Sequence, residues 1–164
     1  MTALTMRLVG GGLLTLAGAL FGWEKNAQMR ETLRCLRTLG RALGRLQAEL
    51  TALQTPLPQL FSALGAECAL FAMVSARFGT QPVETLWCAA VKTLPLGRND
   101  AQALEALGAV LGRYDAARQA AETALVRDRL CVSADALERE IQERGRRFAG
   151  LGAALGAMAA VLLF

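Results

Sequence analysis

The two ends of the chain are continuously apolar, whereas the part between them mixes apolar and polar positions. Residues 8–23 and 148–164 contain no ionisable side chain. Every acidic residue, and every basic residue except Arg7, falls within residues 24–147. A soluble domain has no reason to confine its charge in this way. The pattern predicts an N-terminal transmembrane anchor at 1–23, a cytoplasmic helical bundle at 24–147 and a C-terminal transmembrane helix at 148–164.

Both apolar segments are short for a membrane span. A helix of their length covers about 25 Å, against about 30 Å of hydrocarbon. The first can extend toward the N-terminus if Arg7 reaches the interface, and the second can begin near Gly145. The alternative for the first segment is a cleaved signal peptide, but no A-x-A site follows it and the sequence continues directly into a helical pattern.

Small residues recur at four-residue spacing in both segments, as Gly18 and Gly22 in the first and Gly152 and Gly156 in the second. Such rows allow helices to approach closely in lipid. One interpretation is that the ends pack on each other or on another subunit, which would give a homo-oligomer. The other is that glycine is simply common in short membrane helices.

Arginine and lysine flank the inner side of both predicted spans. The positive-inside rule therefore places residues 24–147 in the cytoplasm and both termini across the cell membrane. The basic positions are Lys25, Arg30, Arg34 and Arg37 after the first span, and Arg139, Arg144, Arg146 and Arg147 before the second.

Residues 24–54 have a strongly helical pattern. Leucines recur at steps of three and four, which predicts a helix packed along its length. They are Leu36, Leu39, Leu43, Leu46, Leu50 and Leu53. Another face carries Arg30, Arg34, Arg37 and Arg41. This arginine stripe is either a solvated face or a contact for an acidic partner or anionic headgroups.

Three further helical stretches follow, two of them before residue 100. Thr55 to Pro58 ends the first helix, and residues 59–78 are apolar on most sides, which predicts one central, buried helix. A shorter helix is expected from Pro82 to Leu94.

Residues 101–147 are almost unbroken helical sequence, with Asn99 or Asp100 as the expected cap. Ser133 is a candidate cap for a restart, so one bent helix and two helices both fit the pattern. The expected inward positions are Leu104, Leu107, Leu111, Tyr114, Leu125, Leu130, Leu137 and Ile141. No strand pattern is present. The fold class is therefore all-α, an antiparallel helical bundle with one transmembrane helix at each end of the chain.

The residue inventory argues against an enzyme. Histidine is absent, which removes the commonest general base and zinc ligand, and no phosphate-binding loop occurs. We expect no catalytic site, no cofactor and no metal. The cysteines Cys35, Cys68, Cys88 and Cys131 form no CxxC motif. Their spacing alone leaves metal and disulfide roles open, but in a helical, cytoplasmic domain we expect them to be mostly small buried hydrophobes. The net charge is +4, but aromatic residues that could stack on bases are not interleaved with the arginines. Nucleic acid is therefore not an expected partner.

Three segments resemble the stage III sporulation protein AB family of endospore-forming bacteria. Glu49-Leu50 is followed by Thr55-Pro56-Leu57 after an arginine-leucine helix. The run from Leu107 to Asp115, with Gln119 four residues further on, is similar to the family's glycine-rich segment. The ending from Arg146 lies where the family has its second span. Together these segments cover the whole chain in compatible order.

The resemblance implies a component of the secretion-like channel that joins the mother cell to the forespore. It implies a place in the mother-cell membrane around the forespore and a soluble domain like the platform protein of type II secretion and type IV pilus systems. The implied partners are the other stage III A sporulation proteins, among them a secretion-type ATPase. The rivals are a pilus-type platform or a membrane-tethered adaptor unrelated to sporulation, and a small channel, which the charge-free spans disfavour.

The candidate partner contacts are Arg30, Arg34, Arg37 and Arg41, together with Asp115 and Gln119. For Gly108 and Gly112 the simpler interpretation is close helix packing. For Asp115 it is an ion pair with Arg113 or Arg118.

Overall fold

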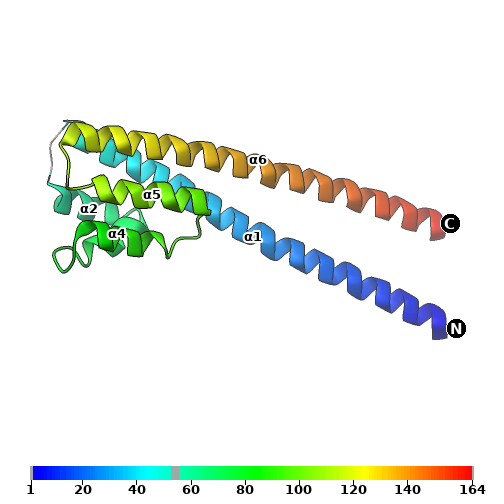
Figure 1. Cartoon of the computed structure of the whole chain (residues 1–164). Helices are drawn as coiled ribbons and strands as arrows, with labels where there is room; N and C mark the ends of the chain where they lie inside the picture. The colour runs from blue at the N-terminus through cyan, green and yellow to red at the C-terminus, as the bar shows by residue number, and fades with distance from the viewer. Residues whose placement is uncertain (1, 53–55, 164) are drawn as a thin grey trace. The chain divides into compact units, whose positions relative to one another are not determined.

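The computed structural model describes the backbone of residues 2–52 and 56–163, and the side chains of residues 26–52 and 56–145. Six helices follow one another in this part of the chain, and its only β-type pairing is an isolated bridge between Phe78 and Gln81. The helices are α1 (Thr2–Ala52), α2 (Leu57–Gly65), α3 (Ala69–Ser75), α4 (Val83–Val91), α5 (Arg98–Val110) and α6 (Ala116–Leu163) (Figure 1). The prediction of an all-helical chain is confirmed.

The chain divides into two units. One is Thr32–Glu140, and the other combines Met1–Glu31 with Ile141–Phe164. The hydrophobic core lies in Thr32–Glu140, where α2–α5 gather against the adjoining parts of α1 and α6 (Figure 1). The site and the core are described within this unit.

The leucine seam of α1 is the base of this core. Leu36, Leu39, Leu43, Leu46 and Leu50 are all buried, and Leu53 lies outside the described residues. Their alternating spacing of three and four puts them on one face of the helix, so the opposite face is left to the arginines. The sequence pattern thus predicted both the helix and its inward side.

The single helix expected over residues 59–78 is wrong. The chain forms α2, turns through Ala66 and Glu67, and restarts as α3 from Cys68, whose backbone is extended at φ −138° and ψ 122°. The break lets Phe61 and Phe71 meet edge to face, with ring centroids 5.3 Å apart. An uninterrupted helix would place these two residues on one rigid rod, where their rings could not face each other.

Trp87 on α4 is the centre of the aromatic core. Its ring is fully buried and lies 5.4 Å from that of Phe71 and 6.0 Å from that of Phe61. Its Nε1 donates a hydrogen bond of 2.6 Å to the Leu104 carbonyl oxygen on α5. Burial of an indole is tolerated when its N–H finds such an acceptor.

The long helix expected over residues 101–147 is interrupted at Gly112, not at Ser133. Gly112 has φ +80°, a left-handed conformation that favours glycine, and it ends α5. Ser133 lies within α6, where its Oγ donates a 2.8 Å hydrogen bond to Asp100 Oδ1 on α5. The predicted caps are also wrong, because Gly97 precedes α5 and Asp100 lies within the first turn, turned toward α6.

Most of the expected inward positions after residue 100 are correct. Leu104, Leu107, Leu111 and Leu130 are buried, and Leu137 packs against the core. Tyr114 and Leu125 are exceptions, at 45% and 66% exposed. The break at Gly112 changes the helical phase, so positions extrapolated across it no longer share one face.

The predicted membrane segments, 1–23 and 148–164, lie outside the residues whose side chains are described. Among the described residues, no helix combines the length and the apolar character that a membrane crossing requires.

Candidate functional site

A groove between α1 and α6 brings part of the arginine stripe onto a defined surface. The groove has a volume of about 510 Å³. Leu36, Gly40 and Ala134 form its buried floor, while Arg37 and Arg41 stand at its exposed rim. Cys131 and Asp135 complete the lining from α6. We call these seven residues the arginine groove.

Small residues allow the two helices to come close beneath this groove. A Cβ atom added to Gly40 would lie 3.5 Å from Cys131 Sγ, and one added to Gly44 would lie 3.6 Å from Arg127 Cδ. Arg127 Nη1 also donates a 2.8 Å hydrogen bond to Gln47 Oε1. These contacts fix the antiparallel register of α1 and α6 within Thr32–Glu140.

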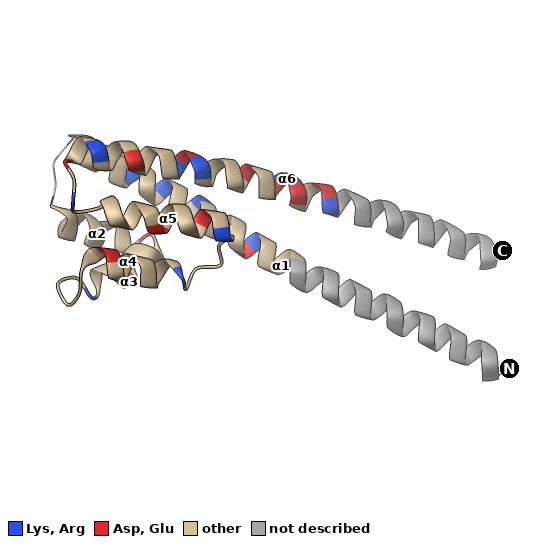
Figure 2. Ribbon diagram, viewed as in Figure 1, with Lys and Arg blue, Asp and Glu red and all other residues tan. Residues whose placement is uncertain are grey.

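The four arginines of the predicted stripe differ in their surroundings. Arg37 forms a 2.5 Å ion pair with Glu138 on α6. Arg41 donates hydrogen bonds within α1, to the Arg37 carbonyl oxygen at 3.4 Å and to Thr38 Oγ1 at 3.5 Å. Arg34 is exposed and has no ion pair among the described residues, and Arg30 belongs to the other unit. Figure 2 shows basic residues recurring along this part of α1, whereas α6 carries both signs of charge. Arg34 and Arg41 are therefore exposed members of the stripe that have no ion pair in the described part of the chain.

The second predicted cluster surrounds the turn between α5 and α6. Gly108 lies directly against Trp87, and an added Cβ would lie 2.5 Å from Trp87 Cδ1. Arg113 pairs with Glu84 on α4 at 2.9 Å, and the Arg118 guanidinium lies 4.2 Å from the centre of the Tyr114 ring. Neither arginine pairs with Asp115.

Asp115 and Gln119 hold the start of α6. Asp115 immediately precedes the helix, where a carboxylate is favoured. The backbone carbonyl oxygen of Asp115 accepts a 3.0 Å hydrogen bond from the backbone N–H of Gln119. The Gln119 side chain is only 7% exposed and donates a 2.5 Å hydrogen bond to the Tyr114 carbonyl. Since this side chain is turned inward, we assign Gln119 to the turn and not to a partner contact. Asp115 itself is exposed.

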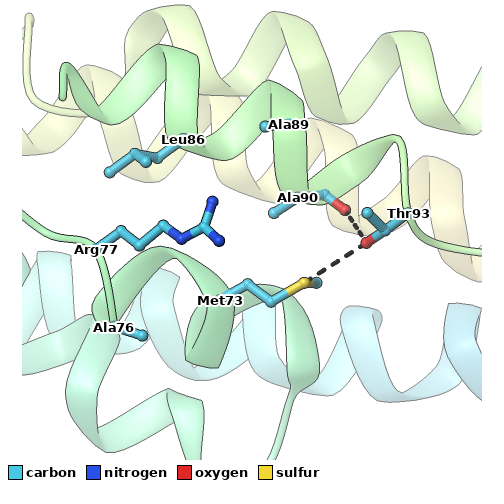
Figure 3. A pocket seen from close by; sticks show the side chains of 7 residues that line it. All are labelled: Met73, Ala76, Arg77, Leu86, Ala89, Ala90 and Thr93. Carbon is cyan, nitrogen blue, oxygen red and sulfur yellow. Dashed lines mark hydrogen bonds between the residues drawn. The ribbon is translucent and has the colours of Figure 1, made fainter. Parts of the chain in front are cut away.

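Sequence reasoning missed a pocket between α3 and α4. It has a volume of about 340 Å³ and is lined by Met73, Ala76, Arg77, Leu86, Ala89, Ala90 and Thr93 (Figure 3). Thr93 Oγ1 closes one end by donating hydrogen bonds to the Ala90 carbonyl at 2.7 Å and to Met73 Sδ at 3.5 Å. The sequence does not predict this pocket, because one wall of the pocket is formed by α3 and the residues after it. The single helix expected over residues 59–78 has no such break.

The cysteines differ widely in exposure. Cys68 is buried and burial raises its pKa, whereas Cys131 is exposed on α6. Burial, together with the nearby Glu105 and Glu84, also raises the pKa of Cys88. Cys131 is therefore an exception to the expectation that the cysteines are mostly buried, and Cys35 and Cys88 are only partly buried. In the described part of the chain, no cluster of cysteine, aspartate and glutamate side chains is arranged to hold a metal ion.

The exposed guanidinium groups are fixed, strong hydrogen-bond donors suited to carboxylates or phosphates.

The model of the family described as stage III sporulation protein AB matches residues 7–164. The chain belongs to this family. No curated protein sequence matches it significantly. A solved structure of "Stage III sporulation protein AB (SpoIIIAB)" is similar, with a TM-score of 0.60 and 26% sequence identity, covering 68% of this chain and 97% of that one. The stage III sporulation protein AB family consists of sporulation components and is not a known enzyme family.

Proposed function

We propose that the chain is a non-enzymatic scaffold of the secretion-like channel between mother cell and forespore, anchored in the mother-cell membrane by both ends. The observation that carries the proposal is the family match over residues 7–164, which includes both charge-free ends of the sequence. A sporulation protein whose charge is confined to its middle is best explained by a helical body held at a bilayer.

The arginine groove is the proposed contact for the secretion-type ATPase. Its floor is apolar and its exposed rim carries Arg37, Arg41 and Asp135, so the rim has a net positive charge, and an apolar centre with a charged rim is typical of protein contacts. Arg41 is exposed and has no ion pair among the described residues. Arg34, about two turns earlier on α1, is also exposed and also lacks such an ion pair. Binding an acidic surface at Arg34 and Arg41 would therefore break no ion pair among the described residues.

Charge reversal tests this contact. We expect Arg34→Glu combined with Arg41→Glu to reduce co-purification of the ATPase from sporulating cells by about tenfold or more, because each substitution replaces a charge-assisted bond with repulsion. Both side chains are exposed, so helicity measured by circular dichroism should not change.

Arg129→Glu is the matched control, because Arg129 is exposed on α6 and lines neither the groove nor the α3–α4 pocket. Arg37→Glu is kept separate, since it also breaks the ion pair with Glu138. Undiminished ATPase recovery with the double variant would rule out the arginine groove as the contact.

A further inference from the structure

The α3–α4 pocket combines apolar walls with an unpaired cation. Figure 3 shows the Arg77 side chain extending into the space between Leu86 on α4 and Met73 on α3. Leu86 and Ala90 are buried at the pocket wall, and Met73 is 36% exposed. Arg77 makes no ion pair with any described residue, so its guanidinium lies over an apolar surface without an anion.

Ion pairs with residues of other segments already neutralise the acidic side chains around the pocket. Residues 56–97 contain four charged side chains, Glu67, Arg77, Glu84 and Lys92. Both acids are neutralised from outside this segment, Glu67 by Arg45 on α1 and Glu84 by Arg113 after α5. Both bases lack an ion pair among the described residues. Arg77 and Lys92 are therefore the charged side chains of this segment that have no ion pair in the described part of the chain.

We propose that this pocket is a second docking site, which receives an acidic segment of a partner protein. One large apolar side chain of the segment would fill the space between Met73 and Leu86, and an aspartate or glutamate about one helical turn away would pair with Arg77. Arginine binds a carboxylate through two parallel hydrogen bonds, which fixes the direction of the docked segment. A buried apolar anchor beside a charged pair is the usual composition of an interface hot spot.

Two features favour a protein segment over other anions. The volume of about 340 Å³ is near the lower limit of sites that enclose a small molecule, which suits one side chain. The exposed alanines Ala76 and Ala89 keep the edges of the pocket low, so that a backbone can approach. The proposal goes beyond the scaffold function and does not require the arginine groove to contact the ATPase.

The experiment places a diazirine amino acid at position 73, within the pocket wall, in the full-length chain in sporulating cells. Crosslinked peptides are then identified by mass spectrometry. We expect one peptide of another protein, with a large apolar residue within four positions of an aspartate or glutamate. Arg77→Glu should lower its yield by about tenfold, the loss expected for one charge-assisted pair.

Three comparisons make the result decisive. Arg129→Glu should leave the yield unchanged, and helicity should be the same in both variants because Arg77 and Arg129 are exposed. Replacing the identified partner carboxylate with arginine should restore crosslinking in the Arg77→Glu background. Ala89→Trp, which fills the pocket from α4, should abolish it without any charge change.

Several outcomes would overturn the proposal. They are adducts to lipid alone, to a second copy of this chain alone or to no partner, a captured peptide without a nearby acid, and a yield that Arg77→Glu does not change. Because the ATPase contact is tested with Arg34 and Arg41, failure at Arg77 is distinguishable from failure of the proposed function.

Discussion

At the scale of single residues, Gly108 has the least room for a side chain among the described glycines, because Trp87 packs directly against it. The indole ring occupies the position where a side chain at residue 108 would lie, and it is itself held by the bond from Nε1 to the Leu104 carbonyl. Neither partner can shift without disturbing the other, because both the ring face and the ring nitrogen are engaged. This contact joins α4 to α5.

Gly108→Ala is expected to destabilise the protein by about 1–3 kcal/mol, the usual cost of overpacking a dense core. The added methyl group would lie 2.5 Å from Trp87 Cδ1, a separation that forces the helices apart. Thermal unfolding of the purified full-length chain, followed by circular dichroism, measures the effect.

Gly44→Ala is the matched control for this substitution. The added methyl group would lie 3.6 Å from Arg127 Cδ, an ordinary contact, and alanine favours the helix. It should leave the melting temperature unchanged or raise it. Equal melting temperatures for Gly108→Ala and the parent chain would contradict the assignment of Gly108 as a packing glycine.

The sequence indicated that Gly108 is a packing position, but it could not indicate Trp87 as the partner. The two residues lie on different helices, and no periodicity connects them. The same holds for Ser133 and Asp100, because both residue types favour helix ends and the sequence predicts each of them as a cap. Instead of capping helices, the two side chains form a hydrogen bond with each other. This bond depends on the packing of α5 on α6, which the sequence pattern does not reveal.

At the scale of helices, patterns within one element were predictable and the breaks between elements were not. The leucine seam of α1 identified its buried face, since five regularly spaced leucines leave little choice. Gly112 sits in a sequence that otherwise continues a helical pattern, and isolated glycines are tolerated in helices. The left-handed turn there is imposed by α6 returning along α1, which is a property of the whole unit.

The turn between α2 and α3 is tied to α1 by the ion pair of Glu67 with Arg45. The hydrogen bond from Arg45 is the main cause that lowers the Glu67 pKa below its usual value. Because the folded-state pKa is lowered, the pair stabilises the fold above the usual glutamate pKa of about 4.3, and this contribution is lost as the pH falls through the folded-state value.

Glu67→Gln should therefore flatten the acid side of the stability profile. We expect the melting temperature of the parent chain to fall more steeply below pH 5 than that of the variant, by a small margin because the pair is exposed. Glu122→Gln is the control, since Glu122 has no ion pair among the described residues. Parallel pH profiles for the parent and Glu67→Gln would show that the pair does not stabilise this turn.

At the scale of the whole molecule, the segregation of charge along the chain connects the helical body to the proposed membrane placement. Basic residues follow the first charge-free segment within α1, and other basic residues precede the second charge-free segment within α6. In the proposed placement, the N-terminal and C-terminal ends of Thr32–Glu140 would both connect to membrane helices. Sequence alone could reach this inference, because it depends on the order of charges and not on side-chain packing.

Cys131 provides a test of that placement, because it is exposed on α6 within Thr32–Glu140. If the body is cytoplasmic, a membrane-impermeant maleimide should label Cys131 in inside-out vesicles and leave it unlabelled in intact protoplasts. The tryptic peptide 130–139 contains this cysteine alone, so mass spectrometry quantifies its labelling separately from the other three. Cys68 is the internal control, since its burial and raised pKa should keep it unlabelled on either side until the protein is unfolded. Labelling of Cys131 in intact protoplasts would place the body outside the cell and remove the basis for an ATPase contact.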